Sequence, residues 1–120
     1  MPEERAAFDA YVARLKELGS HPQVYMKISE VIKRVNGKVS TDINFYRERL
    51  DLLWSIFGEN RVMFASDWPN SEHVGSISDV MTVAREYVTS KGSAAAEKVF
   101  WRNSAAAYRW VRRDSTQPQV

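Results

Sequence analysis

The sequence predicts an α/β fold whose two parallel strands belong to a larger sheet or barrel. Two short β-prone segments, 24–28 and 61–65, are separated by an amphipathic helix that ends near Phe57. Two strands joined through a helix of this length form a right-handed parallel βαβ unit. Parallel sheets are covered on both faces and at both edges, and two strands alone leave their outer edges open. The 120 residues suffice for one small domain.

Apolar stripes and capping residues predict two helices before the second strand. Residues 2–18 predict a first helix, with Pro2 in its first turn and Gly19 as its C-cap. We expect one face of this helix to be buried, through Ala7, Phe8, Tyr11, Val12, Leu15 and Leu18. Asp42 is expected to cap the second helix. Residues 31–41 are ambiguous, although their Asn-Gly pair is a hairpin signal.

Three further helices are expected after the second strand. Ser76 or Ser78 is predicted to cap a helix that runs to about residue 90. Two shorter helices are predicted over 93–99 and 103–112.

Composition excludes several classes of function. The chain has no cysteine, which removes disulfides, thiolate metal sites and cysteine nucleophiles, and fits a cytoplasmic location. A signal peptide on a longer parent chain stays open. No apolar run approaches membrane-spanning length, so no membrane partner is expected. The formal net charge is +2, and the basic residues near the C-terminus fit a helix dipole better than a nucleic-acid site.

The segment 61–71 carries the strongest functional signal. Residues 62–65 are continuously apolar, as in a strand covered on both faces, and Pro69 then stops the pairing. Asp67 therefore lies where a strand ends and a loop begins, which is where parallel α/β proteins bind ligands. A carboxylate there is a candidate metal ligand or general base. The alternative is that Asp67 only caps a turn.

Three segments, 24–29, 57–71 and 100–110, resemble the C-terminal part of the amidohydrolase-related hydrolases (amidohydrolase family 2). The resemblance is carried by Ser-Asp-Trp-Pro after a Gly-x-x-Arg strand start, and by Asn-Ser-Ala-Ala-Ala-Tyr near the end. The family consists of TIM-barrel enzymes that include sugar lactonases, 2-pyrone-4,6-dicarboxylate lactonase and related decarboxylases. The resemblance implies that residues 1–113 are the C-terminal part of a (β/α)8 barrel, with 24–28 and 61–65 as strands seven and eight. Residues 114–120 would be a flexible polar tail.

The resemblance implies that Asp67 is the active-site aspartate, which either binds a divalent metal of the zinc type or activates the attacking water. The family's His-x-His pair of strand one has no counterpart in this chain, which contains only His21 and His73. His21 precedes a strand, at the end of the sheet away from chemistry. We therefore expect that this chain alone does not hold a zinc ion.

Other candidates lie near the same strand ends. Lys27 is a candidate for holding a substrate carboxylate, or else a lysine snorkelling between packed elements. Ser29 and Glu30 follow the first strand as Ser66 and Asp67 follow the second. The remaining candidate substrate contacts are Trp68, Asn70 and His73. The alternatives are that Trp68 packs the loop against the last helix and that His73 is a solvated loop histidine.

Two functions remain open from the sequence. In the first, the chain is the C-terminal part of a hydrolase that cleaves a C–O or C–N bond of a small-molecule substrate, with lactone hydrolysis favoured. The isolated chain would then be inactive, because most of the barrel is missing. In the second, the chain is a non-enzymatic α/β module that forms a homo-oligomer through its open strand edges.

Overall fold

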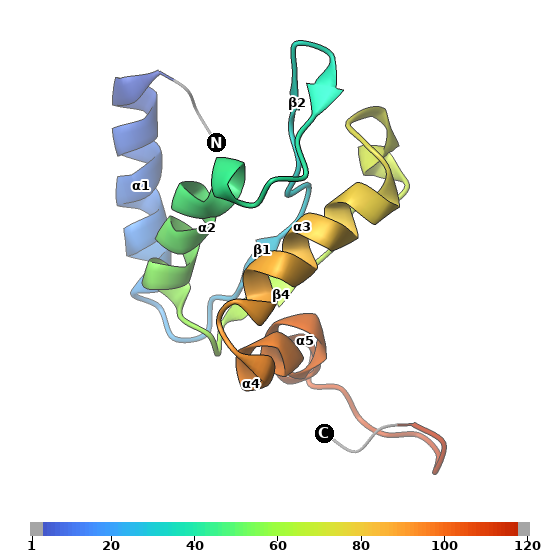
Figure 1. The fold of residues 1–120 in the computed structure, drawn as a ribbon. Coiled ribbons are helices and arrows are strands. Elements are labelled where there is room, and N and C mark those ends of the chain that lie inside the picture. The colour runs from blue at the N-terminus through green and yellow to red at the C-terminus, as the bar shows by residue number, and fades with distance from the viewer. Residues whose placement is uncertain (1–3, 118–120) are drawn as a thin grey trace.

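The computed structural model describes residues 4–117, and the predicted Pro2 turn and residues 118–120 lie outside this range. Figure 1 shows helices α1, α2 and α3 around a pair of short strands, with the C-terminal segment running away from the body. The elements are, in chain order, α1 (Arg5–Gly19), β1 (Met26–Ile28), β2 (Arg34–Val35), β3 (Lys38–Val39), α2 (Asn44–Phe57), β4 (Val62–Phe64), the 3₁₀ helix η1 (Asn70–His73), α3 (Ile77–Thr89), α4 (Ser93–Glu97), the π-helical segment η2 (Lys98–Arg102) and α5 (Asn103–Ala107).

β1 and β4 form the predicted parallel pair, with Lys27 opposite Met63. Both strands are shorter than the predicted ranges 24–28 and 61–65, because turns occupy their first residues. The Val24 N–H donates to the His21 carbonyl, and the Arg61 N–H donates to the Gly58 carbonyl. The pairing itself begins with the Met26 N–H, which donates to the Arg61 carbonyl at 2.8 Å.

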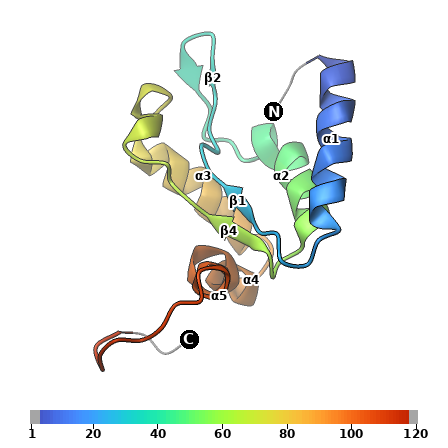
Figure 2. The same ribbon diagram turned by 180° about the vertical axis from the view of Figure 1, so that it is seen from behind.

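The two faces of this pair differ in cover. Alternation along the strands places Ile28 and Val62, both buried, on the core face, and Lys27 and Met63 on the opposite face. Helix α3 crosses the strand pair on the core face, in front of it in Figure 1 and behind it in Figure 2. On the other face Lys27 is exposed whereas Met63 is buried, so the cover of that face is partial. One face of the sheet is therefore the centre of the core.

Helices α2 and α3 bury the apolar faces that their periodicity predicts. The buried positions are Tyr46, Leu50, Leu53 and Phe57 on α2, and Val80, Val83, Ala84, Tyr87 and Val88 on α3. The prediction of a buried face along the whole of α1 was wrong, because only Leu15 is fully buried there and Leu18 is 47% exposed. Helix α1 stands at the margin of the molecule and packs mainly against α2. Phe8, Tyr11 and Val12 are therefore half-buried, and Ala7 is exposed. The predicted C-cap was also wrong by one residue, because Gly19 is still helical and Ser20 is the C-cap. Gly19 allows the contact with α2, since a Cβ there would lie 2.4 Å from Ile56 Cγ2.

The predicted helix starts are close to those observed. Ser76 forms a capping box with Asp79 at the start of α3, which decides between the two serines that the sequence left open. Helix α2 begins at Asn44 with Ile43 at the N-cap position, so the prediction of Asp42 as the cap was wrong by one residue. Asp42 Oδ1 still accepts the Asn44 N–H at 2.9 Å. The hairpin signal in 31–41 is also confirmed: β2 pairs with β3 in antiparallel fashion around Asn36 and Gly37.

The last helix ends earlier than predicted. Residues 93–107 form one helical stretch through the π segment, and the prediction of a separate helix over 103–112 was wrong. Arg109 adopts a left-handed φ of 52°. Its N–H donates to the Ala106 carbonyl, and the Trp110 N–H donates to the Ala105 carbonyl at 2.8 Å. These two bonds form a Schellman motif, which usually has glycine at the left-handed position.

Two polar side chains fix the start of β4. The Arg61 guanidinium donates to the carbonyls of Gly19 and His21, each at 2.9 Å, and so ties the segment before β1 to β4. The Asn103 amide, from α5, donates to the carbonyls of Glu59 at 2.7 Å and Val62 at 2.6 Å. Asn103 is only 5% exposed, so these carbonyls have their partner inside the protein.

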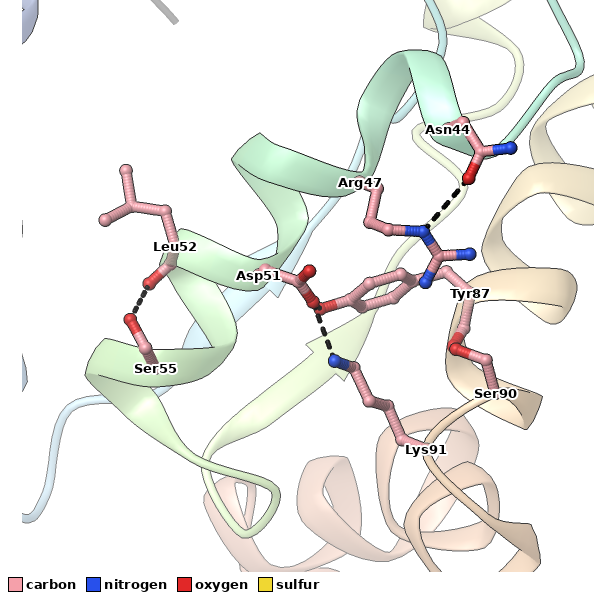
Figure 3. Close-up of polar contacts among 8 residues, drawn as sticks. All are labelled: Asn44, Arg47, Asp51, Leu52, Ser55, Tyr87, Ser90 and Lys91. Atoms are coloured by element: carbon pink, nitrogen blue, oxygen red, sulfur yellow. Dashed lines mark hydrogen bonds and ion pairs between the residues drawn. The ribbon is translucent and has the colours of Figure 1, made fainter.

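A polar cluster joins α2 to the end of α3 (Figure 3). Asp51 Oδ1 accepts hydrogen bonds from the Tyr87 hydroxyl at 2.9 Å and from Lys91 Nζ at 2.6 Å. The bond from Lys91 lowers the pKa of the Asp51 carboxyl, and burial raises the pKa of the Tyr87 hydroxyl. Lys91 Nζ also lies 5.0 Å from the centre of the Tyr87 ring. The cluster therefore holds the two core helices together through one shared carboxylate.

We expect Asn103→Ala to lower the free energy of unfolding by about 2–4 kcal/mol, because the buried Val62 carbonyl and the partly buried Glu59 carbonyl lose their donor. Asn60→Ala, at an exposed turn position nearby, is the control and should change it by less than about 0.5 kcal/mol. Urea unfolding followed by tryptophan fluorescence measures both. Equal losses in the two variants would show that the Asn103 bonds add nothing to stability.

The Asp51 cluster predicts a pH dependence. A carboxyl whose pKa is lowered by folding contributes stability above its unfolded value, near about 4, and loses it as the pH falls through the folded value. Below about pH 4, the unfolding free energy of Asp51→Asn should therefore fall less steeply than that of the wild type. Asp9→Asn, which removes an exposed carboxylate from α1, should keep the wild-type slope. Parallel curves for wild type and Asp51→Asn would contradict the assignment.

Candidate active site at the carboxyl end of the strands

Two carboxylates follow the two parallel strands at the same end of the sheet. Glu30 comes shortly after β1, and Asp67 comes shortly after β4. Both residues are exposed and both have left-handed backbones, with φ of 47° for Glu30 and 54° for Asp67. Among residues 4–117, the Asp67 carboxylate has no hydrogen-bond or ion-pair partner. It is therefore open to a ligand from solvent or from a neighbouring chain segment.

The left-handed conformation is costly for residues other than glycine, by about 1–2 kcal/mol. Aspartate and asparagine tolerate it better than most residues. A carboxylate held in a sparsely populated conformation at a strand end is a reason to look for function, since such outliers cluster at active sites. The turn-cap alternative requires the Asp67 carboxylate to accept a backbone N–H, and within residues 4–117 it accepts none.

The loop after Asp67 contains three of the predicted substrate contacts. Trp68 is 41% exposed, and its backbone N–H donates to Ser66 Oγ at 3.2 Å. Asn70 and His73 lie on the exposed surface of η1. His73 Nδ1 lies 2.8 Å from the Asn70 carbonyl and must carry the proton of that hydrogen bond, because the carbonyl can only accept. When His73 is neutral, its Nε2 is therefore a free acceptor.

The hairpin that follows β1 leans against the loop that follows β4. The Arg34 guanidinium donates to the Val74 carbonyl at 3.0 Å and to the Gly37 carbonyl at 3.2 Å. Gly75 allows this approach, since a Cβ there would lie 2.5 Å from Ile32 Cδ1. The segments that continue from both strands are thus in contact at the end where Asp67 lies, as Figure 1 shows for the hairpin and η1.

Lys27 lies on the sheet face opposite the core face, and it has a partner of its own. Its Nζ is 5.7 Å from the centre of the Tyr108 ring, at the end of α5. The hydrogen bond with Tyr108 raises the pKa of Lys27 above its usual value. Within the described part of the chain, Lys27 is therefore paired with Tyr108 rather than with Asp67.

Some of the predicted residues line a groove beside the first strand, and Asp67 lies outside that groove. A groove of about 570 Å³ follows the β1 side of the sheet, between β1, α1 and α2. Lys27, Ser29 and Glu30 contribute to its lining, whereas Asp67 does not. The structure therefore gathers Asp67, Trp68, Asn70 and His73 in one loop, and Lys27 and Glu30 in the groove beside the neighbouring strand. His21 lies before β1, at the other end of the strands.

The donors present do not make a zinc site by themselves. Zinc in proteins takes three or four protein ligands, chiefly His, Cys, Asp and Glu. Nowhere in residues 4–117 do three such side chains come together. Asp67 offers its carboxylate and His73 its Nε2, so a metal ion at this end of the strands would need ligands from outside the described residues.

Sequence reasoning did not identify three residues that shape this end of the sheet. Ser71, which is fully buried, Arg34 and Tyr108 all contact the loops or side chains of the candidate site. Ser71 and Tyr108 lie in the segments that carry the family resemblance, and this was the one signal available for them. Arg34 had no signal, because its role arises from how the hairpin folds back.

Comparison with known proteins places this geometry in a family. The amidohydrolase family model matches residues 1–110. The chain is 31% identical over 97 residues to an L-fucono-1,5-lactonase from Burkholderia multivorans, a match that covers 78% of this chain and 33% of that protein. The chain thus spans about a third of the length of this curated relative.

Two solved structures of an amidohydrolase from Burkholderia multivorans share the fold. The crystal structure with bound zinc has a TM-score of 0.76 at 24% identity, over 91% of this chain and 40% of that one. The crystal structure with bound HEPES has a TM-score of 0.77 at 23% identity, over 90% and 39%. In the part of the chain that the structure describes, no helix is long and apolar enough to cross a membrane.

The backbone of Asp67 dictates which substitution tests its role. Asparagine tolerates the left-handed conformation, so Asp67→Asn should change the free energy of unfolding by less than about 0.5 kcal/mol. Asp67→Ala should lower it by about 1 kcal/mol, because the alanine Cβ is strained there. Urea unfolding of both variants checks this. An alanine variant as stable as the asparagine variant would show that the conformation relaxes in solution.

Proposed function

The chain belongs to the amidohydrolase family, and from this premise we propose that it forms the C-terminal part of a hydrolase barrel that opens a lactone ring. In this proposal β1 and β4 are the seventh and eighth strands of the barrel. Asp67 is the carboxylate that activates the attacking water. The observation that carries the proposal is the unpartnered carboxylate of Asp67, held in a left-handed conformation where a parallel strand ends.

The chemistry requires a base within hydrogen-bond reach of a water molecule. Asp67 takes a proton from that water as the water oxygen attacks the carbonyl carbon of the lactone. The tetrahedral intermediate then collapses and the ring C–O bond breaks. The leaving alkoxide takes up a proton, and the product is a hydroxy acid. Other C–O and C–N bonds of acyl compounds are open to the same sequence of steps.

Substrate contacts are proposed for the exposed polar groups around Asp67. Asn70 and His73 present an amide and a ring nitrogen from the same loop, and these groups suit the hydroxyls of a sugar lactone. Trp68 offers an exposed apolar surface beside them. Lys27 and Glu30 are proposed contacts from the neighbouring strand. The lactonase relative supports a sugar-derived substrate, at 31% identity over part of its length.

A metal-dependent reaction needs more than this chain supplies. The zinc-bound solved structure supports a divalent metal in the family, and the described residues bring no three ligands together. We therefore assign Asp67 as one ligand at most, with the others from elsewhere in the complete barrel. The steps above rest on the carboxylate alone.

The complete site also needs the rest of the sheet. In the described residues, β1 pairs only with β4, and β4 only with β1, so each strand has one free edge. Closing a barrel requires neighbours at both edges. We therefore expect the 120-residue chain by itself to show no lactonase activity.

The test uses a chimaeric barrel, in which this chain replaces the matching third of the L-fucono-1,5-lactonase relative. Asp67→Asn should lower kcat by about 10²–10⁴-fold, because the general base is lost while the backbone is kept. Glu72→Gln, which removes an exposed carboxylate from the same loop, is the matched control and should stay within about twofold. Proton release on lactone opening measures turnover.

Two results would contradict the proposal. Near-normal turnover in Asp67→Asn, in a chimaera that is folded by circular dichroism, would remove Asp67 from the chemistry. Lactonase activity of the 120-residue chain alone, abolished by Asp67→Asn, would keep Asp67 and refute the need for further strands.

A further inference from the structure

We propose that Ser71 is the positioning residue of the candidate site: it fixes the backbone of Asp67 and so aims its carboxylate. This inference deepens the proposed function and rests on it, since it assigns Asp67 the role of the base. Ser71 itself touches no reacting atom in the proposal, because it is fully buried beneath the loop.

Ser71 is hydrogen-bonded to the two peptide groups on either side of Asp67. Ser71 Oγ donates to the Ser66 carbonyl at 3.1 Å, and the Ser71 N–H donates to the Asp67 carbonyl at 3.0 Å. These carbonyls belong to the peptide planes before and after the Asp67 Cα. The orientation of those two planes defines φ and ψ of Asp67. One serine therefore holds both dihedrals, including the unfavourable φ of 54°.

Ser71 is itself held from the other side. Its carbonyl accepts the Val74 N–H at 2.9 Å and the Gly75 N–H at 3.4 Å. The Val74 carbonyl in turn accepts the Arg34 guanidinium, which belongs to the hairpin after β1. Ser71 is thus anchored to the neighbouring segment and does not simply follow the movements of the loop that it orders.

The chemistry at this position requires a hydroxyl. Replacing Ser71 by alanine keeps the N–H bond to Asp67 but leaves the Ser66 carbonyl without its donor. The peptide before Asp67 is then free to rotate, and the left-handed conformation loses part of what opposes its strain. A displacement of about 1 Å at a catalytic group costs on the order of 10²-fold in rate.

A structural role of Ser71 predicts something different. A residue that only stabilises the fold lowers the melting temperature without changing the dynamics of Asp67 or kcat at a temperature where the protein is folded. Ser104→Ala is the matched control, because the half-buried Ser104 hydroxyl also donates to a carbonyl, that of Trp101 at 2.8 Å, but in the C-terminal helical stretch.

The test has a spectroscopic arm on the 120-residue chain and a kinetic arm on the chimaeric barrel. ¹⁵N relaxation should give an Asp67 order parameter near 0.85 in wild type and Ser104→Ala, falling below about 0.6 in Ser71→Ala. Ser71→Thr keeps the hydroxyl and should restore most of the order. In the chimaera, Ser71→Ala should lower kcat by about 10-fold to 10²-fold with KM changed less, and threonine should recover it.

The outcomes separate this inference from the proposed function. An unchanged Asp67 order parameter in Ser71→Ala overturns the positioning role, whatever the kinetics. An unchanged kcat in Ser71→Ala, when Asp67→Asn lowers it, also overturns that role. If Asp67→Asn leaves kcat unchanged, the proposed function fails, and the relaxation data still decide whether Ser71 fixes Asp67.

Discussion

The parallel pairing of β1 with β4 is the constraint on which the rest of this structure depends. Two strands of three residues form few hydrogen bonds and need other packing to persist. Arg61 supplies part of it by binding the carbonyls before β1, and Asn103 by binding those at the start of β4. The core face of the pair is buried against the central helices. The positions of all candidate site residues follow from this register.

The register has a direct chemical consequence. Parallel strands bring their carboxyl ends to one edge, so Glu30 and Asp67 emerge side by side in the topology although they are far apart in sequence. Both backbones then turn into the left-handed region, which costs free energy. At Asp67 the hydrogen bonds of Ser71 oppose that cost. These hydrogen bonds thus stabilise a conformation in which the Asp67 carboxylate has no partner within residues 4–117.

The strand pair has free edges, as expected of a chain that covers only part of the family fold. The face that carries Lys27 has Tyr108 as a partner at one place, and each strand has one free edge within the described residues. A barrel would place further strands at those edges and further side chains across from Asp67. In the proposed function, the groups that work with Asp67 come from that missing part. The groove beside β1 is lined by Lys27 and Glu30 and does not include Asp67.

Residue pattern alone determined the α/β class, the parallel pair and the position of Asp67 at a strand end, because each follows from local periodicity or turn chemistry. For residues 31–41 the pattern gave a turn signal and left the hairpin open. The family resemblance, read from three short segments, pointed to the same fold. Sequence reasoning failed where distant contacts decide. Only Leu15 of the α1 stripe is fully buried, because α2 is the main element packed against this helix. The last helix stops at Ala107 without a glycine to mark its end. Only the tertiary structure showed that Ser71 holds the two peptides around Asp67, since a serine five residues from Ser66 carries no local signal of the carbonyl it will meet.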